Sequence, residues 1–338
     1  MTYYRAIPHV DAARPDNAKS LAGGWAWFTQ VECLNRGAEP RIIAADDAPQ
    51  DVLDRMTGKR SDVAGLSMAT PQLMGILNVT PDSFSDGGQF NAPDQAIART
   101  KDMVAQGATI IDIGGESTRP GSGYVEIEEE IARTAPVIEA VAPAIDAPIS
   151  IDTRKAPVAA AALKAGAALV NDVSGFTFDA ELGPLSASQK APVCVMHAQG
   201  DPATMQDDPS YDDVLLDVYD FLDAQVRQLE ALGIPRNQIV VDPGIGFGKT
   251  LNHNLALLAR ISLFHSLGCP ILLGASRKSL IGHVSGTTET SERMPGSLAL
   301  ALAGVSQGVQ FLRVHDVAET KQALDLWTAS TTGVFNDA

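Results

Sequence analysis

Cysteine is scarce in this chain of 338 residues, which contains three: Cys33, Cys194 and Cys269. Their number is odd, their spacings are wide and no C-x-x-C pair occurs, which argues against a disulfide framework and against a structural zinc site. This cysteine content is typical of proteins from a reducing compartment, and we expect a cytoplasmic location.

Basic residues are outnumbered: 25 Lys and Arg stand against 41 Asp and Glu, for a formal net charge of -16. A protein that binds duplex nucleic acid or an anionic membrane surface presents a basic face to it, so neither is an expected partner. An anionic substrate would have to be held by a local group of Arg, Lys or metal ion.

Long apolar runs are also missing. No stretch of about 20 consecutive apolar residues occurs, so we expect no membrane-spanning helix. The first residues lead into polar sequence without the apolar segment of a secretory signal, and we expect no such signal. An Ala-rich stretch over 156–170 is interrupted by Lys164 and Gly166, a pattern typical of a helix followed by a strand.

Several catalytic motifs are absent or incomplete. Neither H-x-H nor H-E-x-x-H occurs, which disfavours a metal-dependent hydrolase, and the absence of G-x-S-x-G disfavours a serine hydrolase. The segment 242–250, DPGIGFGKT, resembles a phosphate-binding P-loop but has three residues between Gly244 and Gly248, where that motif needs four. We therefore expect a glycine-rich loop that passes close to a flat ring.

From Leu73 onward, short apolar, β-branched runs alternate with helical patterns. The expected strands are 74–78, 110–113, 149–152, 168–172, 193–197, 239–242, 271–275 and 311–315, and the expected helices include 94–106, 126–141, 157–165, 212–232, 252–267, 295–306 and 317–327. Eight such strand–helix units in about 260 residues predict a (β/α)8, or TIM, barrel over residues 71–338. An open, doubly wound parallel sheet is the alternative.

Residues 1–70 differ from the rest of the chain. They contain turn residues and short alternating segments such as 29–34 but none of the regular repeats, and we expect a small β-rich extension. Its role stays open, because it could close the bottom of the barrel or add to an interface between subunits.

Polar residues end almost every expected strand. The side chains concerned are Asn78, Asp112, Asp152, Asn171, His197, Asp242, Lys278 and His315. Parallel barrel strands end at one rim, and the active sites of barrel enzymes lie there. These separate segments are therefore expected to converge on one pocket.

The acidic and amide residues also allow a purely structural role. Asp112 could cap a turn, and Asp152, Asn171 and Asp242 could form a hydrogen-bond network at the barrel rim. A buried carboxylate at a strand end is costly unless it meets a donor or a cation, so we favour a ligand. These carboxylate and amide groups match the several N–H donors and the one carbonyl of an aminopyrimidinone ring.

Other strand ends carry groups suited to anions and metals. Asn78 offers an amide oxygen, a ligand suited to Mg²⁺ that keeps most of its waters, and the adjoining Gly-rich loop with Phe84 and Asp86 could form a lid. Arg313 and His315 share a face by strand alternation and form an expected pyrophosphate site, although His315 could instead be a satisfied rim histidine.

Three further side chains suit an anionic ligand. Arg119 lies beside Thr118 in a Gly- and Pro-rich loop, where it has no core role and matches a carboxylate or a pyrophosphate. Lys278 directly follows a buried strand, where it can donate to a ring heteroatom or an anion, and Ser279 can hold a carboxylate.

Six of these segments together resemble the dihydropteroate synthase family, from Leu73 to near the C-terminus. They are 78–88 (NVTPDSFSDGG), 114–121 (GGESTRPG), 151–154 (IDTR), 242–249 (DPGIGFGK), 276–279 (SRKS) and 313–315 (RVH). The resemblance implies a cytoplasmic transferase of folate biosynthesis, a target of sulfonamides. Its reaction would join 6-hydroxymethyl-7,8-dihydropterin pyrophosphate to para-aminobenzoate, giving 7,8-dihydropteroate and pyrophosphate, with Mg²⁺ as cofactor and a homodimer as the assembly.

The resemblance also assigns residues. The pterin would be bound by Asp152, Asn171, Asp242 and Lys278, with Met196 and Phe247 packed nearby. The pyrophosphate would be held by Asn78, Arg313 and His315, with Asn78 also the metal ligand. The para-aminobenzoate pocket would be formed by Phe84, Thr118, Arg119, Pro120, Lys278 and Ser279, and the catalytic residues would be Asp152, Lys278, Asp86 and Arg313. The implied course is SN1-like: pyrophosphate leaves first, and the arylamine attacks the pterin methylene cation.

Two other functions would use a similar pterin pocket. A methyltransferase module of similar fold passes a methyl group to a corrinoid, and a non-catalytic pterin-binding protein presents its ligand to a partner. Neither has reason to carry the anion-binding segments 276–279 and 313–315, which favour the synthase. Sulfonamide binding in competition with para-aminobenzoate would separate the synthase from both.

Overall fold

The computed structural model describes residues 1–79, 92–117, 123–200 and 204–334. Its centre is an eight-stranded parallel sheet with the strand order β11-β10-β9-β8-β7-β6-β13-β12. The strands are β6 (Gln72–Asn78), β7 (Ile110–Gly114), β8 (Ile149–Asp152), β9 (Leu169–Asp172), β10 (Val193–Met196), β11 (Ile239–Asp242), β12 (Leu272–Leu273) and β13 (Phe311–Val314). A parallel bridge between Val241 and Ile271 brings the two ends of this sheet together, which confirms the predicted barrel.

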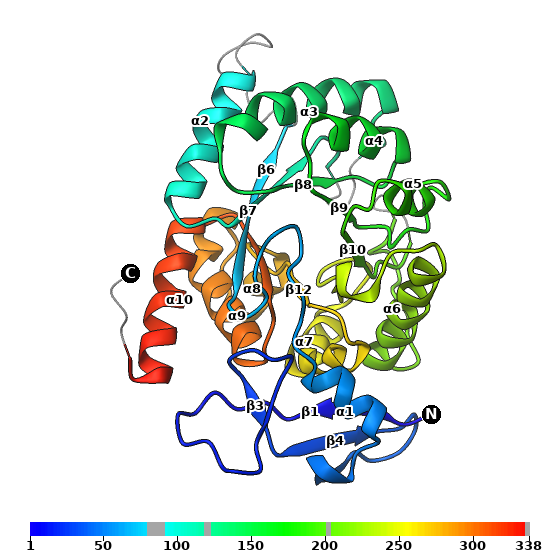
Figure 1. Cartoon of the computed structure of the whole chain (residues 1–338), viewed down its shortest axis with the longest axis vertical. Helices are drawn as coiled ribbons and strands as arrows, with labels where there is room; N and C mark the ends of the chain where they lie inside the picture. The colour runs from blue at the N-terminus through cyan, green and yellow to red at the C-terminus, as the bar shows by residue number, and fades with distance from the viewer. Residues whose placement is uncertain (80–91, 118–122, 201–203, 335–338) are drawn as a thin grey trace.

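Helices cover the outside of the barrel (Figure 1). They are α2 (Ala92–Ala105), α3 (Ile127–Val141), α4 (Ala156–Ala165), α5 (Leu182–Ser188), α6 (Val214–Ala231), α7 (Leu251–Ala259), α8 (Ser279–Ser285), α9 (Met294–Ser306) and α10 (Val317–Thr332). Local sequence sets their ends: Asp213 accepts hydrogen bonds from the first turn of α6, and Gly166 ends α4 in the left-handed conformation, with φ 118°. Within the described ranges, no helix combines the length and the apolar character that a membrane crossing requires.

A helix and a strand illustrate where the structure differs from the sequence-based prediction. The helix predicted over 252–267 is divided at Arg260 into α7 and a 3-10 helix, η6 (Ile261–Leu267). Arg260 leaves the helical conformation, with φ -132°, and its Nε binds Glu32 Oε1 of the N-terminal segment at 3.2 Å. The strand predicted over 271–275 is shorter, because only Leu272 and Leu273 pair with β13.

Apolar side chains fill the end of the barrel where the strands begin. The strand residues of this buried cluster are Met74, Ile110, Leu169, Cys194, Val240, Leu272 and Phe311. Val63 and Met68 of the N-terminal segment belong to the same cluster and are 0% and 1% exposed. Residues 63–68, here termed the plug, therefore close the bottom of the barrel.

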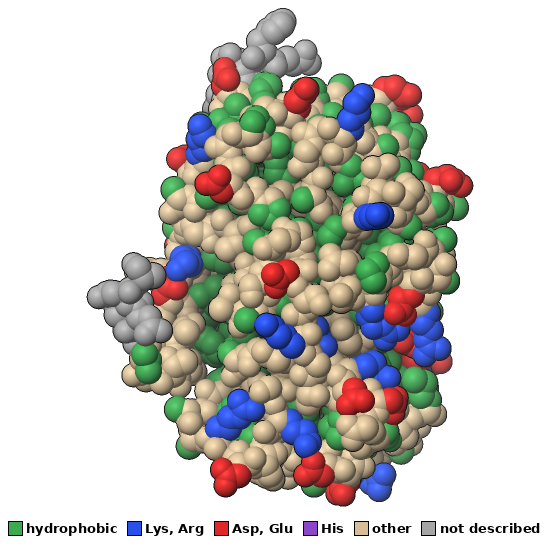
Figure 2. Space-filling model, in the orientation of Figure 1, with side chains coloured by type: hydrophobic (Ala, Val, Ile, Leu, Met, Phe, Trp, Pro, Cys, Tyr) green, Lys and Arg blue, Asp and Glu red, His purple; other side chains and the backbone are tan. Residues whose placement is uncertain are grey.

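The N-terminal segment lies below the barrel (Figure 1). It contains an antiparallel sheet of β1 (Tyr3–Ala6), β4 (Gln30–Leu34) and β5 (Arg41–Ala44), a strand pair of β2 (Lys19–Ser20) and β3 (Trp27–Phe28), and helix α1 (Gln50–Thr57). Arg36 pairs with Asp217 and Asp220 of α6 at 2.5 and 2.7 Å, and Trp25 Nε1 donates to the Val305 carbonyl at 2.8 Å. Figure 2 shows acidic and basic side chains intermixed over the visible face. Polar contacts thus attach the segment to the barrel beside the apolar plug.

Met68→Ala is expected to lower the free energy of unfolding by about 2–5 kcal/mol, because it leaves a cavity inside the barrel. Equilibrium urea unfolding measures the change. Ile42→Ala is the control, since Ile42 is 61% exposed and its truncation should cost no more than about 0.5 kcal/mol. Equal effects of the two substitutions would mean that the plug contributes nothing to the stability of the barrel.

Candidate active site

Four predicted site residues meet at the rim where the barrel strands finish. In the sheet register Asp152 lies beside Asn171, and Met196 lies beside Asp242. Strand alternation points these side chains into the barrel, on the same side as the apolar cluster below them. All four are buried, with Asp152 and Asp242 each 6% exposed. The structure therefore brings together side chains from four separate strands, and three of these side chains are polar.

Arg313 of β13 reaches across this rim to two carboxylates. Its Nε donates to Asp112 Oδ2 at 2.6 Å, and its Nη2 donates to Asp152 Oδ2 at 2.8 Å. Asp112 is fully buried and also accepts a hydrogen bond from Asn171 Nδ2 at 3.3 Å. The turn-capping alternative for Asp112 is therefore wrong: its carboxylate is a partner of the rim cation, a role that the sequence analysis missed.

Burial and charge pairing set the ionisation of this group. Burial raises the pKa of Asp152 to about 7, against the opposing effect of Arg313 and with a further rise from Asp112. Burial also acts to lower the pKa of Arg313, but the two carboxylates outweigh it and hold that pKa above its ordinary value. Arg313 therefore stays cationic, while Asp152 can gain or lose a proton near neutral pH.

Lys278 lies over an aromatic ring at the same rim. Its Nζ is 3.9 Å from the centroid of the Phe247 ring and donates to the backbone carbonyl of Ile245. Burial lowers the pKa of Lys278 to about 7, although Asp242 favours its charged form. Asp242 accepts a hydrogen bond from the Gly244 N–H at 2.7 Å, and burial raises the pKa of its carboxyl group. A donor, an acceptor and an aromatic face thus lie together.

His315, Ser279 and Asn78 lie at other strand ends of the rim. Ser276 Oγ is 3.0 Å from His315 Nδ1 and accepts from the His315 backbone N–H at 3.2 Å. Ser279 is exposed and begins α8, and the Asn78 side chain at the end of β6 has no hydrogen bond among the described residues. The remaining predicted site residues lie outside the described residues: Phe84, Asp86, Thr118, Arg119 and Pro120.

A buried lysine and histidine fix the loop that follows β11. Lys249 Nζ is 2.9 Å from His197 Nδ1, and it donates to the carbonyls of His197 and Phe247 at 3.2 and 3.0 Å. Burial, and then Lys249, lower the pKa of His197 to about 2, so this imidazole is neutral. His197 therefore supports the loop as a partner of Lys249, a residue that the sequence analysis did not assign.

Gly244→Ala is expected to lower the free energy of unfolding by about 2–4 kcal/mol through steric overlap and backbone strain. Gly244 has φ +69°, and an added Cβ would lie 1.9 Å from the His197 carbonyl oxygen. Gly37→Ala is the matched control, because Gly37 has φ +68° and no atom within 4 Å of an added Cβ. Urea unfolding of both variants isolates the overlap; equal losses would show that the close approach to His197 has no energetic role.

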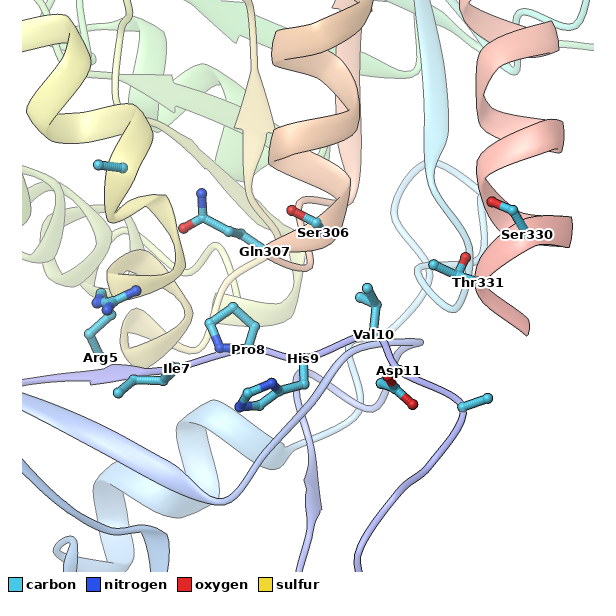
Figure 3. A pocket seen from close by; sticks show the side chains of 12 residues that line it. Arg5, Ile7, Pro8, His9, Val10, Asp11, Ser306, Gln307, Ser330 and Thr331 are labelled. Carbon is cyan, nitrogen blue, oxygen red and sulfur yellow. The ribbon is translucent and has the colours of Figure 1, made fainter. Parts of the chain in front are cut away.

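Cavities occur at both ends of the barrel. One of about 310 Å³ opens beside Phe247 and is also lined by Val173, Ala198 and Met205, so it belongs to the strand-end rim. A larger one of about 790 Å³ lies between residues 5–12 and the ends of α9 and α10 (Figure 3). This second cavity is at the opposite end of the barrel and none of the strand-end residues lines it. The polar groups therefore locate the site at the rim, although the cavity there is smaller.

Sequence comparison identifies relatives over the same region. A family model described as pterin binding enzyme matches residues 74–315. Over 273 residues the chain is 46% identical to the dihydropteroate synthase of Escherichia coli strain K12, which covers 80% of this chain and 95% of that protein. The plug and the sheet of the N-terminal segment precede the residues matched by the family model.

Solved structures point to the same family. The Yersinia pestis dihydropteroate synthase in a sulfonamide drug complex gives a TM-score of 0.75 at 44% identity, covering 80% of this chain and 98% of that chain. The Xanthomonas albilineans dihydropteroate synthase with 4-aminobenzoic acid gives a TM-score of 0.75 at 42% identity, covering 80% of this chain and 97% of that chain. The chain therefore belongs to the pterin-binding enzyme family, as a member of its dihydropteroate synthases.

Proposed function

We propose that this transferase condenses 6-hydroxymethyl-7,8-dihydropterin pyrophosphate with para-aminobenzoate, giving 7,8-dihydropteroate and pyrophosphate in folate biosynthesis. The observation that carries the proposal is the meeting of Asp152, Asn171 and Asp242 at the rim where Lys278 lies over Phe247. Two carboxylates, an amide and a lysine beside an aromatic ring suit the edge and the flat face of a pterin. The names of the relatives, and the 4-aminobenzoic acid in the Xanthomonas structure, support the same reaction.

The pyrophosphate would be held by Asn78, Arg313 and His315, with Mg²⁺ as the cofactor. Asn78 offers one oxygen ligand, and no group of three or more His, Cys, Asp or Glu side chains able to hold a metal occurs within the described ranges. Mg²⁺ commonly takes few protein ligands and completes its shell with phosphate oxygens and water, so this donor set fits an ion that arrives with the substrate. When bound, Mg²⁺ would offset negative charge on the pyrophosphate.

An SN1-like course requires the site to stabilise two opposite charges. The Arg313 guanidinium would stabilise the negative charge that develops on the departing pyrophosphate. The Asp152 carboxylate, 2.8 Å from that guanidinium, would stabilise the cation delocalised over the pterin and its methylene carbon. The para-aminobenzoate nitrogen then forms the new C–N bond to this carbon and releases a proton.

The para-aminobenzoate would be bound beside the pterin. Lys278 and the exposed hydroxyl of Ser279 are adjacent donors suited to its carboxylate. The family resemblance adds Phe84, Thr118, Arg119 and Pro120 to this pocket and gives Asp86 a catalytic role.

We further propose that the enzyme is a cytoplasmic homodimer with small-molecule substrates. Its three cysteines are buried and free, as suits a reducing compartment. Size-exclusion chromatography with light scattering tests the assembly, and a mass equal to one chain would contradict the dimer.

Mass spectrometry of the product tests the proposed reaction. Purified protein with hydroxymethyl-dihydropterin pyrophosphate, para-aminobenzoate and Mg²⁺ should form dihydropteroate, EDTA should stop its formation, and excess Mg²⁺ should restore it. A sulfonamide should inhibit in competition with para-aminobenzoate. Pterin binding without any product would instead favour a methyltransferase module or a non-catalytic binding protein.

A further inference from the structure

A buried charged cluster lies behind the rim, at the connection between β7 and α3. It is termed the Lys155 cluster and consists of Glu116, Glu130, Thr153, Arg154 and Lys155. Glu116 lies two residues after the end of β7, Glu130 lies in the first turn of α3, and the other three residues directly follow β8. None of the five is more than 8% exposed. Two carboxylates and two cations are therefore packed together away from solvent.

Lys155 is the centre of this cluster and is 1% exposed. Its Nζ donates to Glu130 Oε2 at 2.6 Å, to the backbone carbonyl of Val125 at 2.5 Å and to Glu116 Oε2. The same nitrogen is 4.2 Å from the centroid of the Tyr124 ring. An ammonium group has three N–H donors, and these contacts use all of them. Such a fully satisfied buried network rigidifies the groups that it joins.

The contacts hold both ends of the β7–α3 connection. Glu116 lies just after β7, and Val125 lies just before α3. Besides its contact with Lys155, Glu116 accepts from Arg154 Nε and Nη2 at 2.9 and 2.8 Å, and from the Val125 N–H at 3.1 Å. The two ends are therefore tied to each other and to the turn that follows Asp152.

We propose that Lys155 is a positioning residue for the arylamine substrate. It holds the described ends of the β7–α3 connection, residues 115–117 and 123–126, against the β8–α4 turn, and so sets the position of these ends relative to a pterin at Asp152. The inference rests on the proposed function, which gives this connection a part in binding para-aminobenzoate. Among the described residues the hydrogen bonds of Lys155 Nζ go to Glu116, Val125 and Glu130, so it acts through them and touches neither substrate.

Lys155→Met tests the proposal, because it removes the three donors and keeps most of the length of the unbranched side chain. The KM for para-aminobenzoate is expected to rise about 10-fold to 100-fold, as displaced binding groups commonly cause. The KM for the pterin pyrophosphate should stay within about twofold, and kcat at saturating arylamine should be near that of the wild type. Lys164→Met, at an exposed position of α4, is the matched control and should change neither KM.

A double variant covers the case in which Lys155→Met does not fold. Lys155→Met combined with Glu130→Gln removes one buried cation and one buried anion together, and the expected split between the two KM values is the same. Equal increases in both KM values would indicate a general structural role and overturn the proposal. An unchanged KM for para-aminobenzoate in a folded variant would overturn it as well.

Hydrogen exchange distinguishes a failure of this inference from a failure of the proposed function. A wild-type protein that forms no dihydropteroate would contradict the proposed function. Hydrogen exchange then tests whether Lys155 holds the two ends of the connection. Amides of residues 115–117 and 123–126 should exchange faster in Lys155→Met than in Lys164→Met. Equal exchange in the two variants would overturn the inference, whatever the activity of the wild type.

Discussion

Asp152→Asn is expected to lower kcat by about 100-fold to 1000-fold and to change either KM by less than about tenfold. Asparagine keeps an oxygen at this strand end but removes the negative charge. In the proposed mechanism that charge stabilises the pterin cation, which develops in the transition state, so its loss should lower kcat. Arg313 retains Asp112 as its counter-ion at 2.6 Å, so the variant is expected to fold. Steady-state kinetics, with dihydropteroate measured by mass spectrometry, gives both parameters.

Ser150→Ala is the control for this substitution. Ser150 lies on the same face of β8 as Asp152, is fully buried, and its hydroxyl has no partner among the described residues. Its removal should leave kcat within about twofold of the wild type. If Asp152→Asn raised KM without lowering kcat, Asp152 would have a role in binding alone.

The pH dependence of the reaction should change in the same variant. Burial raises the pKa of Asp152 to about 7, and the carboxylate is the active form, so kcat/KM should fall as pH falls through about 7. Burial lowers the pKa of Lys278 to about 7, so its positive charge is lost, and kcat/KM falls again, as pH rises through that range. Asp152→Asn should lose the acid limb and keep the alkaline one. A wild-type profile without curvature near neutral pH would contradict both assignments.

Arg313→Met is expected to lower both the stability and the activity of the protein. Methionine replaces the aliphatic part of the arginine side chain without its charge, and leaves the carboxylates of Asp112 and Asp152 without their guanidinium. Removing one partner of a buried ion pair costs about 3–5 kcal/mol in the free energy of unfolding. Loss of a cation from a phosphoryl-binding site lowers kcat/KM by about 1000-fold or more. Urea unfolding and steady-state kinetics measure the two losses.

A second substitution separates the two effects. Arg313→Met combined with Asp112→Asn removes a buried cation and a buried anion together, so about 2 kcal/mol or more of the lost stability should return. Activity should stay low, because the pyrophosphate site still lacks its cation. Recovery of activity together with stability would show that Arg313 is required only for folding. Arg227→Met, at an ion pair whose arginine side chain is 68% exposed, is the control and should cost at most about 1 kcal/mol.

Most of the barrel could be predicted because its strands are short apolar runs that carry their own signal. Ile149–Asp152 and Ile239–Asp242 have the same bounds in the sequence analysis and in the structure, and every residue of both is buried. The break between α7 and η6 could not be predicted in this way. It is associated with the contact of Arg260 with Glu32, which is 228 residues away in the chain.

The candidate site could likewise be predicted only where local sequence determines it. Strand direction and alternation alone bring Asp152, Asn171 and Asp242 to one rim, so their types and positions were enough to predict it. Partners on other strands are not contained in any local pattern. Arg313 and Asp112 are 201 residues apart, so the local sequence pattern predicts the cation without its carboxylate.

The plug imposes an order on the biosynthesis of this protein. Val63 and Met68 leave the ribosome before any barrel strand, whereas Phe311, which belongs to the same buried cluster, lies in the last one. The apolar side chains of the plug therefore cannot be fully buried until nearly all of the chain has been translated. Contacts between such distant residues slow folding, and apolar groups exposed during the delay favour aggregation. Nascent chains should therefore depend most on chaperones just before β13 emerges.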